Sequence, residues 1–221
     1  MALSETVNSS MRTVTARPWL NVRDGPGLAG QIVGKAETGL RVVVFDELPG
    51  TKYTWLQIGF NGGIAYIAKK WTTAFYFENW PCDSRKVNWG NPFGARPEYY
   101  GKWGLPGHEG LDIITKDRDP IYAVADGIIY RVEKDETASN YGIHVRIEHI
   151  DYHKTIYAHL AETATEIAVG EFVAAGTLIG YADSTGNSSG THLHFTLKAP
   201  YAPWNWPGDQ IDPWPYLELI A

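Results

Sequence analysis

The 221-residue chain has almost no cysteine, no block of like charge and no long apolar segment. Its one cysteine, Cys82, cannot form a disulfide within the chain, so no disulfide framework holds the fold. Lys and Arg number 19 against 25 Asp and Glu, and the formal net charge of −6 disfavours a nucleic-acid partner. No apolar run approaches the roughly 20 residues that cross a bilayer. We therefore expect a soluble globular protein without a membrane span.

Helical periodicity is also scarce, because no stretch longer than two turns repeats apolar residues at helical spacing. Short alternating or β-branched segments occur instead, bounded by Gly, Asn, Asp and Pro, as is typical of strands and hairpins. In the first third of the chain they are 19–23, 31–34, 40–45, 52–60 and 64–67. Later they are 111–114, 121–125, 127–133, 143–149, 155–159, 172–174, 178–182 and 192–198. The pattern predicts a mainly β protein, with a small N-terminal β-barrel followed by a second domain that is also mainly β.

Composition divides the chain into four segments. We predict an N-terminal tail over 1–12, the barrel over 13–75, a connecting loop over 76–105 and the second domain over 106–221. The connecting loop is rich in Trp, Tyr, Pro and Gly, and we expect it to be ordered because such dense aromatics are unusual in a flexible linker. Its Trp89, Phe93, Tyr99 and Trp103 could line a groove or shield one.

All seven histidines follow residue 107, so any imidazole chemistry belongs to the second domain. Read with a period of two, His108 and Asp112 point to one face of a strand and offer one nitrogen and one oxygen ligand. His192 and His194 share a face in the same way, which suits one metal ligand and one neighbouring proton-transfer group. His159 ends an apolar strand.

Taken singly, each histidine has a plain structural explanation, and we expect that role for His144, His149 and His153. Taken together, His108, Asp112 and one histidine of the 192/194 pair complete a zinc site of two His and one carboxylate, with a fourth position open for water. The two remaining histidines are then available for proton transfer. Other divalent metals could occupy the same ligands. Glu109 is a poor general base, because glycines interrupt the helix that an H-E-x-x-H motif requires.

Three motifs in the second domain resemble the LytM/lysostaphin-type metallopeptidases, the M23 family of peptidoglycan endopeptidases. They are GHEGLD at 107–112, YAHL at 157–160 and STGNSSGTHLHF at 184–195. The resemblance implies that His108, Asp112 and His194 bind Zn²⁺, while His159 and His192 flank the attacking water. It implies an antiparallel β-sheet peptidase domain of the LytM/lysostaphin type, which follows the SH3-like barrel, and a zinc-dependent endopeptidase that cleaves the stem peptide or cross-bridge of bacterial peptidoglycan. A non-catalytic wall-binding or hydrolase-activating relative is the alternative.

A tyrosine upstream of the first ligand often assists catalysis in this family. Here the spacing departs, since Tyr99 and Tyr100 lie nine and eight residues before His108. Tyr100 is a candidate for stabilising the oxyanion that forms during hydrolysis. We favour the alternative that it is an aromatic residue packed within the loop.

The N-terminal domain resembles a bacterial SH3 domain through LNVRDGPG at 20–27 and the hairpin over 55–67. Such domains accompany cell-wall hydrolases, which implies targeting to wall peptide or glycan; a rigid spacer is the alternative. We expect a monomer that acts outside the cell or in the cell wall. The start MALSETVNSSMRT lacks the basic and apolar stretches of a secretory signal, which favours a phage-released lysin or a trimmed secreted enzyme.

Overall fold

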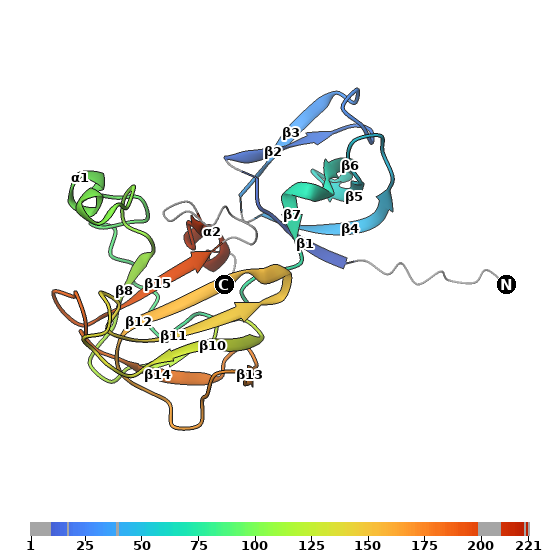
Figure 1. The fold of residues 1–221 in the computed structure, drawn as a ribbon. Coiled ribbons are helices and arrows are strands. Elements are labelled where there is room, and N and C mark those ends of the chain that lie inside the picture. Colours follow the sequence, from blue (N-terminus) through green and yellow to red (C-terminus); the bar gives the residue numbers. More distant parts are fainter. Residues whose placement is uncertain (1–9, 17, 39, 199–208, 219, 221) are drawn as a thin grey trace. The chain divides into compact units, whose positions relative to one another are not determined.

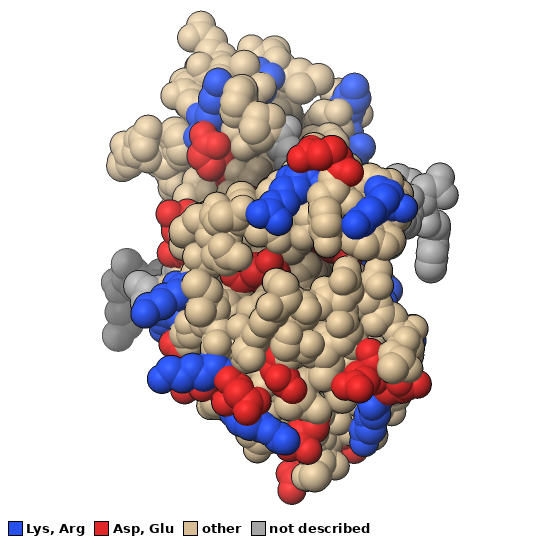
Figure 2. Space-filling model, turned by 90° about the vertical axis from the view of Figure 1, so that its left-hand side faces the viewer, with Lys and Arg blue, Asp and Glu red and all other residues tan. Residues whose placement is uncertain are grey.

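The computed structural model describes residues 10–16, 18–38, 40–198, 209–218 and 220. The chain divides into two compact units, residues 1–76 and 77–221, and both are built on antiparallel β-sheet (Figure 1). The predicted mainly β fold is confirmed. No helix among the described residues is long and apolar enough to cross a membrane. On the face that Figure 2 shows, basic and acidic side chains are interspersed.

The described residues of the first unit form seven strands in the order β3-β2-β6-β5-β4-β1-β7. They are β1 (Ser10–Val14), β2 (Trp19–Arg23), β3 (Ile32–Glu37), β4 (Arg41–Leu48), β5 (Trp55–Phe60), β6 (Gly63–Ala68) and β7 (Thr72–Thr73), with a 3₁₀ turn η1 (Lys69–Trp71) before β7. Alternate residues of these strands, among them Leu20, Val22, Leu56 and Ile58, are buried and form one apolar core. The sheet therefore closes around the side chains that the alternating pattern predicts as apolar.

One part of the first unit departs from the expectation, because β1 begins at Ser10, inside the segment predicted as a tail. The strand pairs with β4 on one side, from Ser10 opposite Val44, and with β7 on the other. The Arg12 side chain donates from Nε to Thr72 Oγ1 at 2.7 Å. The local sequence SMRT carries no strong strand signal, so this strand depends on partners distant in the sequence.

The described residues of the second unit form nine strands. They are β8 (Leu111–Ile114), β9 (Pro120–Tyr122), β10 (Gly127–Glu133), β11 (Ile143–His149), β12 (Lys154–Thr163), β13 (Phe172–Val173), β14 (Leu178–Ala182), β15 (His192–Lys198) and β16 (Gln210–Ile211). The main order is β13-β10-β11-β12-β14-β9, and β15 joins β12 to β8 and β16. Short helical turns lie outside the sheet: α1 (Pro97–Tyr100), η2 (Gly101–Trp103), η3 (Ile150–Tyr152) and α2 (Trp214–Leu217).

Strand β12 is longer than predicted and changes partners halfway. Residues 154–158 pair with β15, whereas residues 160–163 pair with β14. His159 lies at the change and has a φ of 62°, a left-handed conformation that is uncommon for a residue with a side chain. Its position is thus inside a strand, at a bulge, and not at the strand end that the sequence indicated. Such bulges reorient side chains, and strain of this kind is frequent at functional sites.

The aromatic segment after residue 76 packs on the second unit's sheet. Phe77 contacts Phe195 and Tyr216, with ring centroids 5.5 and 5.4 Å apart. Isolated bridges join Cys82 to Ile121 and Val87 to Ile113. Phe77 and Trp80 of this segment are buried, whereas Trp89, Tyr99 and Trp103 are exposed.

Candidate metal centre

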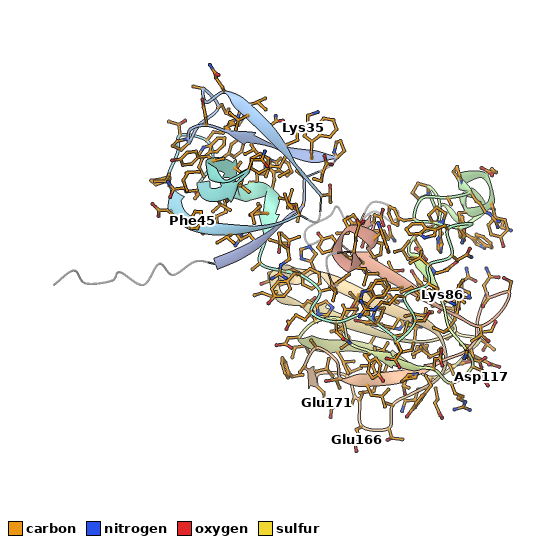
Figure 3. The ribbon with its side chains drawn as sticks, turned by 180° about the vertical axis from the view of Figure 1, so that it is seen from behind. Lys35, Phe45, Lys86, Asp117, Glu166 and Glu171 are labelled. Carbon is orange, nitrogen blue, oxygen red and sulfur yellow. The ribbon has the colours of Figure 1, made fainter. Side chains whose placement is uncertain are left out.

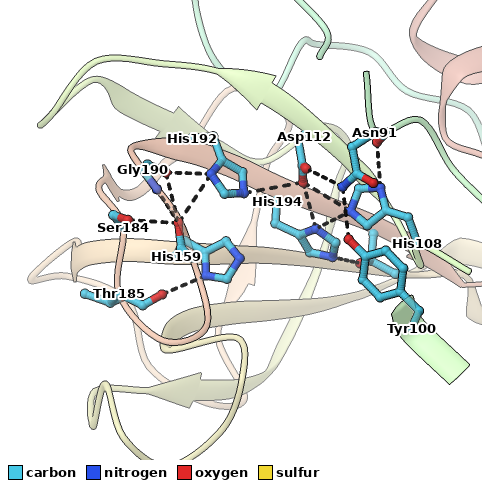
Figure 4. A network of polar contacts seen from close by, with 12 residues as sticks. Asn91, Tyr100, His108, Asp112, His159, Ser184, Thr185, Gly190, His192 and His194 are labelled. Atoms are coloured by element: carbon cyan, nitrogen blue, oxygen red, sulfur yellow. Dashed lines mark hydrogen bonds and ion pairs between the residues drawn. The ribbon is translucent and has the colours of Figure 1, made fainter. Parts of the chain in front are cut away.

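Three side chains of the second unit converge on one point. His108 Nε2 and His194 Nδ1 lie 3.1 Å apart, and they lie 3.2 and 3.1 Å from the same oxygen, Oδ1 of Asp112 (Figure 4). All three residues are buried. Two imidazole nitrogens and one carboxylate oxygen therefore face one another across a space that each could share with a cation.

Sheet register places two of these three residues. Asp112 on β8 and His194 on β15 are directly opposite each other in the antiparallel pair. Their neighbours Ile113 and Leu193 are fully buried on the other face. The predicted alternation of His192 and His194 with buried apolar residues is thus present in β15.

His108 reaches the cluster differently from the prediction, because it lies in the loop before β8 and not in a strand. Its backbone pairs with the loop over 94–95: Gly94 N donates to its carbonyl at 2.8 Å, and its N–H donates to Ala95 at 2.9 Å. Gly110 lets the chain pass close to β15 before it enters β8, because a Cβ there would stand 2.5 Å from the carbonyl oxygen of Phe195. His108 and Asp112 are therefore close together, as predicted. The cause is a loop contact, however, and not two positions on one face of a strand.

A hydrogen bond fixes the tautomer of His108, and a second contact orients the ring of His194. The Nδ1–H of His108 donates to the backbone carbonyl of Asn91 at 2.8 Å, which leaves the Nε2 lone pair free to bind a cation. His194 Nε2 lies 3.1 Å from Thr196 Oγ1, a hydroxyl that can donate or accept, and His194 Nδ1 faces Asp112 Oδ1 at 3.1 Å. Burial alone would raise the pKa of Asp112, but its contacts with three imidazoles lower that pKa far below the ordinary value.

His159 and His192 stand beside this cluster, with ring centroids 4.9 Å apart. Each is tied through Nδ1 to a backbone carbonyl, His159 to Thr185 at 2.7 Å and His192 to Gly190 at 2.7 Å. His192 Nε2 lies 3.4 Å from Asp112 Oδ1. Burial and the neighbouring imidazoles lower the pKa of His159 to about 3. Burial opposes protonation of His192, but its contact with Asp112 outweighs that effect and raises its pKa.

The five residues border a cleft of about 240 Å³. Tyr99 and Trp103 from the aromatic loop line this cleft, which is one of the two roles considered for them. Trp89 instead packs edge-on against Trp214, with ring centroids 4.8 Å apart. Tyr100 also lines it, with its ring stacked on His108 at 5.4 Å. Burial raises the pKa of the Tyr100 phenol, so this group keeps its hydrogen at neutral pH.

The donor set fits a zinc ion. Ligands about 2.0–2.2 Å from a tetrahedral zinc are about 3.3 Å from one another, close to the spacing of the three converging atoms. Two neutral imidazoles and one carboxylate are a frequent set for catalytic zinc, because they leave a coordination position open. Among the described residues, these three form a group whose ligand atoms all lie within 4.8 Å of one another.

Two of the remaining histidines have the structural roles expected of them. His144 is fully buried, donates from Nδ1 to Gly142 at 2.8 Å and accepts from Arg146 Nε at 3.0 Å. His149 donates from Nδ1 to Asp126 at 2.8 Å and contacts Thr155 Oγ1 through Nε2 at 2.7 Å. Both rings use both nitrogens within the sheet. His153 is also buried.

Two residues that support the ligands, Asn91 and Thr196, are not among those predicted from the sequence. Thr196 follows His194 by two residues and shares its strand face, so the alternation could have pointed to it. Asn91 lies 17 residues before His108 in a loop, and no periodic signal joins the two.

Comparison with known proteins gives two matching families. The model of peptidase family M23 matches residues 106–213, and that of the bacterial SH3 domain matches residues 20–73. The chain is similar to the DD-carboxypeptidase/endopeptidase Mpg of Neisseria meningitidis, with 37% identity over 117 residues, or 52% of this chain and 25% of Mpg. It is also similar to the peptidoglycan DD-endopeptidase ShyB of Vibrio cholerae, with 31% identity over 121 residues, or 55% of this chain and 27% of ShyB.

The matched part thus spans about a quarter of the length of these curated relatives. Among solved structures, the solution structure of lysostaphin is similar, with a TM-score of 0.50 and 24% identity. The similarity covers 66% of this chain and 55% of that one, and it shows a shared fold.

Proposed function

Since residues 106–213 of this chain form a peptidase family M23 domain and residues 20–73 form a bacterial SH3 domain, we propose that the protein is a zinc-dependent endopeptidase acting on bacterial peptidoglycan. The bond it hydrolyses lies in the stem peptide or the cross-bridge. One observation carries the proposal: His108, Asp112 and His194 converge in a cleft that two further imidazoles border. Metal ligands and proton-transfer groups side by side are what peptide hydrolysis by an activated water requires.

Each residue has a separate task in this proposal. His108, Asp112 and His194 hold zinc, which when bound polarises the scissile carbonyl and makes the attacking water more acidic. His159 and His192 present Nε2 to the cleft, because a backbone carbonyl holds Nδ1 of each ring. Between them they would take a proton from the water and pass one to the leaving amine. Positioned proton transfer of this kind contributes about 10²- to 10⁴-fold to a rate.

The substrate class follows from the relatives and agrees with the character of the cleft. Mpg and ShyB are named as a DD-carboxypeptidase/endopeptidase and a peptidoglycan DD-endopeptidase. Tyr99 and Trp103 give the cleft an apolar part, and Asn187, Ser188 and Ser189 give it polar groups for a peptide backbone. We place the activity outside the cytoplasm, where peptidoglycan lies, and assign it to a monomer.

The first unit would attach the enzyme to the wall. Trp19, Tyr53, Trp55 and Trp71 line a second cleft of about 330 Å³ in that unit. Aromatic faces of this kind contact sugar rings or flat peptide segments. The Lys35 ammonium lies 3.5 Å from the Trp19 ring centroid and makes a cation–π contact with that ring.

Metal removal and restoration test the proposal. Dialysis against a chelator should abolish release of peptide fragments from purified peptidoglycan, and one equivalent of Zn²⁺ should restore it. A protein that binds one zinc tightly and releases nothing from any wall type would instead be a wall-binding or hydrolase-activating relative.

A further inference from the structure

Asn91 touches three different groups of the candidate metal centre. Its backbone carbonyl accepts the Nδ1–H of His108 at 2.8 Å. Its side-chain Nδ2 lies 3.0 Å from Asp112 Oδ2 and 3.0 Å from the Tyr100 hydroxyl oxygen (Figure 4). One loop residue therefore contacts two of the three ligand residues and the tyrosine that lines the cleft.

The orientation of the Asn91 carboxamide follows from Asp112. An ionised carboxylate has only acceptor atoms, so the group that faces Oδ2 must be the NH₂ and not the carbonyl of the amide. With Oδ2 held by this bond, the other oxygen, Oδ1, is the one that faces His108 and His194. The two oxygens of Asp112 thus have different contacts, because Oδ2 accepts from the Asn91 amide and Oδ1 faces the two imidazoles.

The same orientation decides where the Tyr100 hydroxyl points. Nδ2 carries two hydrogens, and the one not used by Asp112 lies toward the phenol oxygen. The phenol oxygen then acts as acceptor toward Asn91, so its own hydrogen must point elsewhere. Tyr100 lines the cleft, and the hydrogen is free to meet a group bound there.

A further detail indicates that the site dictates this arrangement. The carbonyl oxygen of the carboxamide, Oδ1 of Asn91, is buried and has no hydrogen-bond partner among the described residues. A buried acceptor without a partner is unfavourable for stability. The two hydrogen bonds from Nδ2 are therefore made although Oδ1 is left without a partner. This arrangement is explained if the two bonds support the candidate metal centre.

We propose that Asn91 is a positioning residue that keeps Oδ1 of Asp112 turned toward His108 and His194 and directs the Tyr100 hydroxyl hydrogen into the cleft. The inference rests on the proposed zinc peptidase function. Asn91 contacts candidate ligands and a residue of the cleft without being a ligand itself. Replacing its side chain should therefore change both metal affinity and turnover. Loss of such supporting groups typically lowers metal affinity or activity about 10- to 100-fold.

Substitutions at position 91 separate the side chain from the backbone. Asn91→Ala removes both Nδ2 bonds but retains the carbonyl that holds His108. Asn91→Asp keeps the shape of the side chain and places a second carboxylate beside Asp112, where it would repel Asp112 and take the Tyr100 hydrogen for itself. Both variants should bind zinc about 10- to 100-fold more weakly in a chelator competition, and both should lose kcat by a similar factor.

Asn88→Ala is the matched control. Asn88 lies in the same loop, is exposed and uses its side-chain oxygen to accept the Gly90 N–H at 3.1 Å. This substitution removes an amide and a turn bond, and it leaves the side-chain bonds of Asp112 and Tyr100 in place. Zinc affinity and kcat should stay at the wild-type level.

A double-mutant cycle with Tyr100→Phe distinguishes positioning from general damage to the loop. In the Tyr100→Phe background, Asn91→Ala should still weaken zinc binding, but its effect on kcat should shrink, because the hydroxyl it directs is gone. If Asn91→Ala does not fold by circular dichroism, the same comparison is made with Asn91→Asp. Wild-type zinc affinity and kcat in a folded Asn91 variant, or equal losses in Asn88→Ala, would overturn the proposal.

The two proposals fail in different ways. If the wild-type protein binds zinc but cleaves no peptidoglycan, the proposed function is wrong, whereas the zinc affinities of the Asn91 variants still decide the role of Asn91. If the wild type cleaves peptidoglycan and the Asn91 variants match it, the function stands and the positioning role is wrong.

Discussion

The Nδ1 atom of His194 lies 3.1 Å from Oδ1 of Asp112, and these two residues are directly opposite each other on strands β15 and β8. The buried apolar residues beside them, Leu193 and Ile113, fix which face of the strands carries the polar groups. A slip of one residue in either strand would turn the polar side chain of that strand to the other face. The hydrophobic pattern that stabilises the sheet therefore also brings two candidate ligands together.

Removing one ligand should remove the metal. We expect His194→Ala to retain no zinc after gel filtration, because one imidazole and one carboxylate remain in place of three protein ligands. Metal content per protein, measured by mass spectrometry of the element, checks this. One equivalent of zinc in the purified variant would contradict the assignment of His194 as a ligand.

Removing one of the two imidazoles that flank the candidate ligands should lower turnover and leave the metal bound. His192→Ala and His159→Asn should keep the metal and lose turnover by about 10²- to 10⁴-fold. Asn suits position 159 because it tolerates the left-handed backbone that His159 adopts. Metal content and kcat are measured on the same preparations. Full activity in His192→Ala would rule out its proton-transfer role.

Acid should destabilise the second unit through His149. Burial lowers its pKa to about 4, against an ordinary value of 6.5. Between these two values the unfolded chain binds the proton and the folded chain does not, so stability is present above pH 6.5 and falls as the pH drops towards 4. A shift of this size corresponds to about 3 kcal/mol.

The variant His149→Gln isolates this contribution. Its free energy of unfolding from urea titrations should change less between about pH 7 and about pH 4.5 than that of the wild type, because one titrating group is gone. The difference in slope is the relevant quantity, since the substitution itself alters packing. Parallel pH profiles for the two proteins would exclude His149 as a source of acid sensitivity.

The first unit should matter for attachment more than for chemistry. Deleting residues 1–74 should weaken sedimentation with whole walls more than cleavage of small soluble peptides. Trp71→Ala should act in the same direction, because Trp71 is 42% exposed and lines the aromatic cleft. Phe45→Ala is the control, since Phe45 on β4 is 39% exposed and is not among the residues that line that cleft (Figure 3). Equal losses of attachment and cleavage would support the rigid-spacer alternative.

Several parts of this structure could be predicted from the sequence because they depend on local alternation. Strands β8, β10, β11, β14 and β15 have the predicted bounds, and the side chains of His192 and His194 share the predicted face. These predictions need only a period of two and the identity of the apolar residues.

The parts that could not be predicted depend on contacts between distant segments. The bulge at His159 arises where β12 exchanges β15 for β14, which no local pattern records. His108 is held by backbone bonds to the loop over 94–95, and Asn91 reaches Asp112 from 21 positions away. Loop placement of this kind is set by tertiary packing.

The most direct test of the proposed function is digestion of purified peptidoglycans that differ in cross-link chemistry, with and without a chelator, followed by mass spectrometry of the released fragments. We expect new peptide amines at one type of bond, released only when metal is present and lost in His159→Asn. Fragments that appear equally with the chelator, or no fragments from any wall type by a zinc-loaded protein, would contradict it.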